Sequence, residues 1–139
     1  MAFYKIAIAK VLKAEKGYSK DPQDVGGETY NGISRCFFPS WAGWKIVDEY
    51  KKKLGFPINL RDSISLNSMV TEFYKTNFWD KIKGDSIKNQ SIANLLVDSA
   101  VNEGIVPAIK RAQEIVSLPQ TGKVDDLLIS KLNALEASI

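Results

Sequence analysis

The stretch from Glu15 to Ser34, EKGYSKDPQDVGGETYNGIS, decides how this chain folds. It places an acidic residue directly before a loop rich in glycine, aspartate and other turn-forming residues. Within it, Thr29-Tyr30 and Ile33-Ser34 flank Asn31-Gly32, a pair typical of tight hairpin turns. We therefore predict an ordered loop or a minimal β-hairpin over residues 17–34, because only two residues on each side of the turn are available to pair.

The residues before this stretch have the periodicity of a helix. Apolar side chains recur at helical spacing from residue 3 onward, and Gly17 is a natural C-terminal stop, so we predict a first helix over residues 3–16. Glu15 would then lie in the last turn, where the negative end of the helix dipole disfavours a charged carboxylate. A carboxyl group that keeps its proton suits a general acid.

Helical patterns return after Pro39 and continue to the C-terminus. The predicted helices cover residues 41–53, 66–78, 91–101 and 107–117, followed by a last helix capped by Asp125 or Asp126. We expect residues 59–65 to form a linker that offers Asp62, Ser63 or Ser65 as a helix cap. Since no internal repeat and no long linker is visible, we predict one compact, mainly helical domain.

Composition places the chain among ordinary globular proteins. It has 139 residues, of which 45% are hydrophobic and 25% are charged. The formal net charge of +3 is mild and the lysines are scattered, so we expect no nucleic-acid partner. A mildly basic surface does favour encounter with a polyanion such as a bacterial cell wall.

The residue types that are missing narrow the chemistry. The chain contains no histidine, which excludes serine, cysteine and zinc hydrolases that rely on imidazole as base or ligand. Its single cysteine, Cys36, has no partner for a disulfide or a thiolate metal site, and we expect it to be inert packing. We therefore predict no cofactor and no metal, and carboxylate chemistry is what remains.

No segment of the sequence is suited to a membrane. The apolar stretch 3–12 is interrupted by Lys5 and Lys10 and lacks a following cleavage site, which makes it a poor signal peptide. No apolar run approaches the roughly 20 residues that span a bilayer. We expect synthesis in the cytoplasm without membrane insertion, so that any substrate outside the cell would require a separate release route.

Carboxylates gather in the opening stretch, where glycoside cleavage would need them. Most glycosidases use one carboxyl group that protonates the leaving oxygen and a second group that handles the water or the sugar cation. The candidates for these two roles are Glu15, Asp21, Asp24 and Glu28.

The same residues form a motif with a known counterpart. The pattern E-K-G-Y-S-x-D-P-x-D-x-G-G-x-T-x-x-G-I over residues 15–33 resembles the signature of glycoside hydrolase family 108, the N-acetylmuramidases. Residues 73–80 are similar to the family's aromatic helix end, and residues 96–104 to its second segment. Ala112-Gln113 and the turn 121–125 resemble its C-terminal portion, which is described as peptidoglycan-binding-like.

This resemblance implies a mainly α, lysozyme-like helical globule that cleaves the bond between N-acetylmuramic acid and N-acetylglucosamine. Proteins of this type occur as phage endolysins and as bacterial secretion activator proteins. Residues 1–88 would form the muramidase part, and residues 89–139 a C-terminal helical part packed into the same globule. The partner would be peptidoglycan glycan strands, acted on by a monomer after holin-like or other non-classical release.

The resemblance also implies roles for single residues. The family's catalytic glutamate falls on Glu15. The order of Glu15, Asp24 and Thr29 is similar to the acid, aspartate and threonine of phage-type lysozymes, which implies that Asp24 and Thr29 hold the attacking water and that the sugar carbon is inverted. Lys16 departs from the family, which usually has a glycine there, and the C-terminal turn has fewer glycines than usual.

Each assignment has a structural alternative. Asp24 could organise its loop by binding backbone amides, and Thr29 could be an ordinary β-branched hairpin residue. Glu28 is expected to be a solvated loop acid or a sugar contact. Further candidate substrate-binding residues are Tyr18 and Tyr30, inside the motif, and Asp98 and Asn102, which lie four apart on one helix face and could instead make a polar helix-to-loop contact.

Two other functions remain open on the sequence. A lytic transglycosylase needs only the acid. A wall-binding or secretion-assisting module that no longer uses its site would need no catalysis at all, since a fold does not establish activity.

Overall fold

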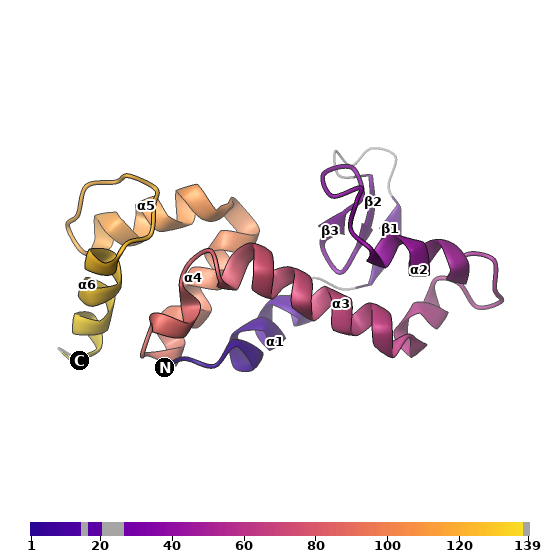
Figure 1. The fold of residues 1–139 in the computed structure, drawn as a ribbon, viewed down its shortest axis with the longest axis horizontal. Helices are drawn as coiled ribbons and strands as arrows, with labels where there is room; N and C mark the ends of the chain where they lie inside the picture. The colour runs from indigo at the N-terminus through magenta and orange to yellow at the C-terminus, as the bar shows by residue number, and fades with distance from the viewer. Residues whose placement is uncertain (15–16, 21–26, 138–139) are drawn as a thin grey trace. The chain divides into compact units, whose positions relative to one another are not determined.

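The computed structural model describes residues 1–14, 17–20 and 27–137 (Figure 1). It confirms a mainly helical chain with a small β-hairpin after the first helix. The chain divides into two compact units, residues 12–73 and residues 1–11 with 74–139. The predicted division at residue 88 is a functional one and stays a prediction.

The predicted hairpin is present and carries one strand more than expected. Helix α1 spans Tyr4–Ala14, and the antiparallel strands β1 (Tyr18–Lys20), β2 (Glu28–Tyr30) and β3 (Ile33–Ser34) follow in that order. Asn31 and Gly32 both have positive φ, 47° and 83°, as a tight hairpin turn between β2 and β3 requires. Asn31 also fixes the start of β1, because its Oδ1 accepts a hydrogen bond from the Gly17 amide at 2.6 Å.

In the unit of residues 12–73, three helical segments follow the sheet. Helix α2 (Gly43–Tyr50) is shorter than the predicted 41–53, and its Trp44 and Val47 are buried. The expected linker contains a 3-10 helix, η1 (Ile58–Asp62), because the buried Leu60 anchors it. Helix α3 (Ile64–Tyr74) begins at the predicted Ser63 cap, whose Oγ accepts a hydrogen bond from the Leu66 amide at 3.1 Å.

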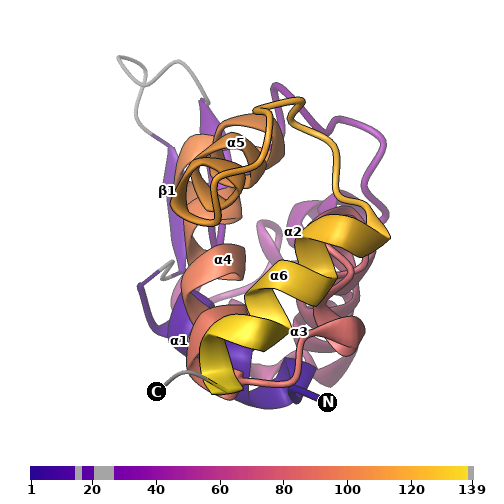
Figure 2. The ribbon, with the colours of Figure 1, turned by 90° about the vertical axis from the view of Figure 1, so that its left-hand side faces the viewer.

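The other unit contains the C-terminal helices. The π-helix η2 (Lys75–Trp79) and the 3-10 helix η3 (Gly84–Ser86) precede α4 (Gln90–Glu103), α5 (Ile105–Ile115) and α6 (Asp126–Ala137). Helices α4 and α5 pack against each other on either side of Gly104 (Figure 2). The predicted cap Asp125 is confirmed, because its Oδ1 accepts a hydrogen bond from the Leu128 amide at 2.8 Å.

Trp79 is one of the fully buried residues of that unit. Its ring is fully buried, and its Nε1 donates to Asp85 Oδ1 at 2.9 Å. Gly84 packs directly on the ring, since a Cβ atom there would lie 2.3 Å from it. Asn133 of α6 joins the adjacent segment by donating to the Ser86 carbonyl at 3.1 Å and accepting from the Lys88 amide at 3.0 Å.

The exposure of Cys36 tests one expectation from the sequence. Cys36 is exposed, which corrects the expectation that it is packing; it lies in a turn after β3 that carries its side chain away from the core. In the described part of the chain, none of the helices has both the length and the apolar character that a membrane crossing requires.

The turn that resembles the family's C-terminal portion is held by one buried glutamine. The Gln113 side chain, on α5, accepts a hydrogen bond from the Gly122 amide at 3.0 Å and donates to the Lys123 carbonyl at 3.1 Å and to Thr121 Oγ1 at 2.9 Å. Gly122 itself has a positive φ of 77° and abuts Val106. Gln113 therefore satisfies the backbone of the turn that connects α5 to α6.

We expect Gln113→Leu to lower the free energy of unfolding by about 2 kcal/mol, because the Gly122 amide and the Lys123 carbonyl lose their partner. Urea denaturation followed by circular dichroism measures the change. Gln120→Leu is the matched control, since Gln120 is exposed on the same turn and should change stability by no more than about 0.5 kcal/mol. Equal stability of the two variants would contradict the assignment.

Candidate functional site

A pocket in the unit of residues 12–73 carries several of the predicted site residues. Its volume is about 470 Å³. Leu12 and Gly17, which flank Glu15 in the sequence, both line it. The remaining described residues of its wall are Tyr18, Tyr30, Asn31, Pro57, Ile58, Leu60, Arg61 and Asn67.

The sheet brings the two predicted tyrosines together. Tyr18 of β1 lies opposite Tyr30 of β2, so both side chains extend from the same face of the sheet. The Tyr30 hydroxyl donates to Asn67 Oδ1 at 2.9 Å, and burial raises its pKa. The Asn67 amide nitrogen in turn donates to the carbonyls of Ser63 and Arg61, at 2.9 and 3.2 Å.

Tyr18 is held at both ends. Its ring packs edge-on against Phe56 with centroids 4.9 Å apart, and its hydroxyl donates to Glu28 Oε2 at 2.5 Å. Burial, and then the hydrogen bond to Glu28, raise the pKa of Tyr18. Because its proton is committed to Glu28, the Tyr18 oxygen can only accept a further hydrogen bond from a ligand.

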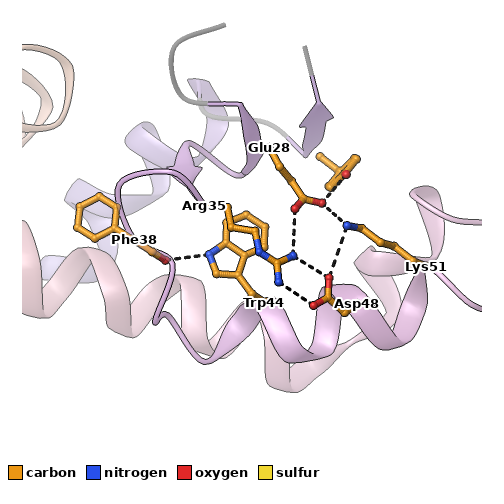
Figure 3. Close-up of polar contacts among 7 residues, drawn as sticks. Glu28, Arg35, Phe38, Trp44, Asp48 and Lys51 are labelled. Atoms are coloured by element: carbon orange, nitrogen blue, oxygen red, sulfur yellow. Dashed lines mark hydrogen bonds and ion pairs between the residues drawn. The ribbon is translucent and has the colours of Figure 1, made fainter. Parts of the chain in front are cut away.

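Glu28 is the centre of a charged network, which corrects the expectation that it is a solvated loop acid. Its side chain is only 9% exposed. Arg35 donates to Glu28 Oε1 at 3.0 Å, and Lys51 lies 2.5 Å from Oε2 (Figure 3). A buried carboxylate needs such partners, because an unpaired charge in the interior is costly.

Asp48 of α2 completes the network. Both Arg35 terminal nitrogens bind its carboxylate, at 2.7 and 2.8 Å, and Lys51 lies 3.5 Å from Oδ1. The Arg35 guanidinium also lies over the buried Trp44 ring, 5.2 Å from its centroid (Figure 3). The network therefore joins β2 and the residue after β3 to helix α2. It lies next to Tyr18, which binds Glu28 and lines the pocket.

These contacts shift the ionisation of both carboxylates. Hydrogen bonds from Arg35 lower the pKa of Asp48 to about 2. Burial opposes ionisation of Glu28, but hydrogen bonds from Lys51, Tyr18 and Arg35 outweigh it and lower its pKa. Hydrogen bonds to Asp48 raise the pKa of Arg35, so Glu28, Asp48 and Arg35 remain charged at neutral pH.

The remaining predicted residues do not line this pocket in the described part of the chain. Glu15 and Asp24 lie outside the described residues. Thr29 is half-buried on β2, and its side chain extends from the opposite face to Tyr30, in a row with Ser19 and Ser34. Asp98 and Asn102 are exposed on α4, in the other unit. The catalytic and substrate-binding roles of all these residues stay predictions.

The sequence did not indicate the pocket residues that lie after the sheet in the chain. Pro57, Ile58 and Arg61 fall in or beside the segment expected to be a linker, and Asn67 was assigned only to a helix. A polar residue one turn after a serine cap was the single signal that could have suggested Asn67. The described residues contain no group of histidine, cysteine, aspartate and glutamate side chains that could hold a metal ion.

The network should make the unit of residues 12–73 sensitive to acid. A carboxylate with a depressed pKa stabilises the folded state above its unfolded pKa of about 4, and this contribution is lost as pH falls through the folded value. For Asp48 that window extends from about pH 4 down to about pH 2. We expect Asp48→Asn to flatten the dependence of the melting temperature on pH in this range, as measured by circular dichroism.

Asp62→Asn is the control for this prediction. Asp62 is exposed in the same unit and makes no ion pair within the described residues. The network assignment fails if Asp62→Asn flattens the acid profile as much as Asp48→Asn does.

Comparison with known proteins agrees with this architecture. The chain is similar to the solved structure of Brucella abortus SagA, with 25% sequence identity and a TM-score of 0.67, over 94% of this chain and 68% of that one. This likeness supports the expected lysozyme-like fold. No curated protein matches the chain significantly. The sequence profile described as Glycosyl hydrolase 108 matches residues 8–104, and the chain therefore belongs to glycosyl hydrolase family 108.

Proposed function

We propose that this protein is an N-acetylmuramidase that hydrolyses the bond between N-acetylmuramic acid and N-acetylglucosamine in bacterial peptidoglycan. Membership of the family supports a lysozyme-like peptidoglycan hydrolase. The observation that carries the finer proposal is the pocket whose wall includes Leu12 and Gly17, the residues that flank the motif glutamate, together with Tyr18 and Tyr30.

In the proposed mechanism Glu15 is the general acid. It gives its proton to the glycosidic oxygen as the bond from that oxygen to the anomeric carbon breaks, which leaves a neutral hydroxyl on the departing sugar. Water attacks the same carbon from the opposite face. Asp24 accepts the proton of this water, and Thr29 helps to hold it, so that the configuration at the anomeric carbon is inverted.

The pocket is suited to a sugar ring. Apolar C–H faces of sugars pack on aromatic rings and on apolar side chains such as Pro57 and Ile58. The Tyr18 oxygen, with its proton donated to Glu28, offers an acceptor for a sugar hydroxyl or for an acetamido N–H group. Asn67 plays a supporting part, since its side chain is occupied by Tyr30 and by two carbonyls.

Asp98 and Asn102 are proposed as additional contacts to the glycan. They are exposed on one face of α4, and no side-chain partner is recorded for either of them within the described residues. Carboxylate and amide groups in this position are able to bind sugar hydroxyl or acetamido groups.

Glu15→Gln tests the general acid. The amide is nearly isosteric but cannot deliver a proton, so we expect kcat to fall by about 10²- to 10⁴-fold with an unchanged melting temperature. Release of soluble fragments from purified peptidoglycan, identified by mass spectrometry, is the measurement. Reducing muramic ends support hydrolysis, whereas anhydromuramic ends would identify a lytic transglycosylase.

Glu49→Gln is the matched control, because Glu49 is exposed on α2 and makes no recorded ion pair within the described residues. It should retain the wild-type rate. Full activity of Glu15→Gln would refute the assignment. Peptidoglycan binding without any release of fragments by the wild type would instead indicate a non-catalytic wall-binding module.

Asp24→Asn tests the second carboxylate. We expect a reduced kcat with a smaller loss than in Glu15→Gln, because the geometry around the water survives while the proton acceptor is lost. Proton NMR of the first product formed by the wild type reports the anomeric configuration, which should be inverted. A retained configuration, or a full rate for Asp24→Ala, would exclude this role for Asp24.

A further inference from the structure

Arg61 differs from the other two arginines of the chain in having no carboxylate partner among the residues that the structure describes. Arg35 binds Asp48 and Glu28, and Arg111 binds Glu103 at 2.7 Å. The Arg61 side chain is exposed, and no ion pair or hydrogen bond of its guanidinium is recorded within the described residues. Its five N–H donors are therefore available to a ligand.

The backbone from which this side chain extends is fixed. Leu60, the preceding residue, is 1% exposed, and the Arg61 carbonyl accepts a hydrogen bond from Asn67 Nδ2 at 3.2 Å. The same Asn67 binds the Tyr30 hydroxyl, so Arg61 is coupled to the tyrosine wall of the pocket. The backbone of Arg61 is thus held beside the pocket, while its guanidinium makes no hydrogen bond to another described residue.

Arg61 adds a positive charge to the described part of the pocket wall. Among the described residues of the wall, it is the only one that is ionised at neutral pH. The others supply phenol, carboxamide and apolar groups, which suit a neutral sugar ring. A single guanidinium beside such a surface favours a saccharide that also carries a carboxylate, because the two groups can form paired hydrogen bonds.

We propose that Arg61 is a specificity-determining residue that selects glycans whose sugar bears a carboxylate-containing substituent over neutral N-acetylated glycans. This inference rests on the proposed function, since it assigns the substrate class of the same pocket. In peptidoglycan the carboxylate has two sources: the lactyl group of a muramic residue without peptide, or the peptide stem attached to that group. A polymer of N-acetylglucosamine alone has neither.

Binding to the full-length Glu15→Gln protein tests the proposal without hydrolysis. Isothermal titration calorimetry would compare three soluble oligosaccharides of equal length: peptidoglycan strands with peptide stems, the same strands stripped by an amidase, and an N-acetylglucosamine oligomer. We expect the carboxylated strands to bind roughly fivefold more tightly than the neutral oligomer, the upper range for an exposed ion pair. The preference should shrink as salt rises.

Adding Arg61→Gln should remove this preference and leave the affinity for the neutral oligomer unchanged. Lys45→Gln is the charge-matched control, since Lys45 is exposed on α2 in the same unit and does not line the pocket; it should keep the preference. Arg61→Gln retains the backbone carbonyl of residue 61 that Asn67 binds. An unchanged melting temperature of this variant verifies that it is folded.

The results separate this inference from the proposed activity. Tighter binding of stripped strands identifies the lactyl carboxylate as the ligand group, and tighter binding of strands with stems identifies the stem. Equal affinity for all three ligands, no binding to any, or a preference that survives in Arg61→Gln overturns the role of Arg61. Failure of the wild type to cleave peptidoglycan would overturn the hydrolase proposal alone, because the binding preference does not depend on turnover.

Discussion

The buried carboxylate of Glu28 is the constraint on which the unit of residues 12–73 depends. A strand of three residues beside another of three residues has little intrinsic stability, so the sheet needs an anchor outside itself. Glu28 provides it by binding Tyr18 within the sheet, Arg35 after β3 and Lys51 after α2. Loss of any one partner would weaken the compensation of the largely buried Glu28 charge and release one of the segments that it joins.

Glu28 also supports the wall of the pocket, because it binds Tyr18, one of the residues that line it. Tyr18 is fixed by Glu28 at its hydroxyl and by Phe56 at its ring, while Tyr30 is fixed by Asn67. The two rings therefore present a preorganised surface, and a ligand that packs on them loses little side-chain entropy of the protein. Polar atoms used for this support are less available to a ligand, and among the described residues of the wall the Arg61 guanidinium is the charged group without such a supporting contact.

Local rules predicted the elements, and tertiary contacts decided what the rules missed. The Asn31-Gly32 turn and the caps at Ser63 and Asp125 depend on nearby backbone, so the sequence placed each of them among a few neighbouring candidates. The burial of Glu28 depends on its ion pair with Lys51, which is remote in sequence. The spacing of apolar residues along the chain cannot predict such a pair. The 3-10 helix η1 was missed for the same reason, because one buried leucine in a polar segment carries no periodic signal.

The residues that produce the family resemblance therefore divide by physical role. Glu28 lies within the motif stretch yet organises the sheet, and Gln113 lies in the C-terminal similarity yet satisfies the backbone of a turn. Both are polar side chains that make several hydrogen bonds inside the protein. Family resemblance in the sequence therefore does not by itself separate residues that hold the fold from residues that contact a ligand, and the hydrogen-bond partners of each side chain are needed to tell them apart.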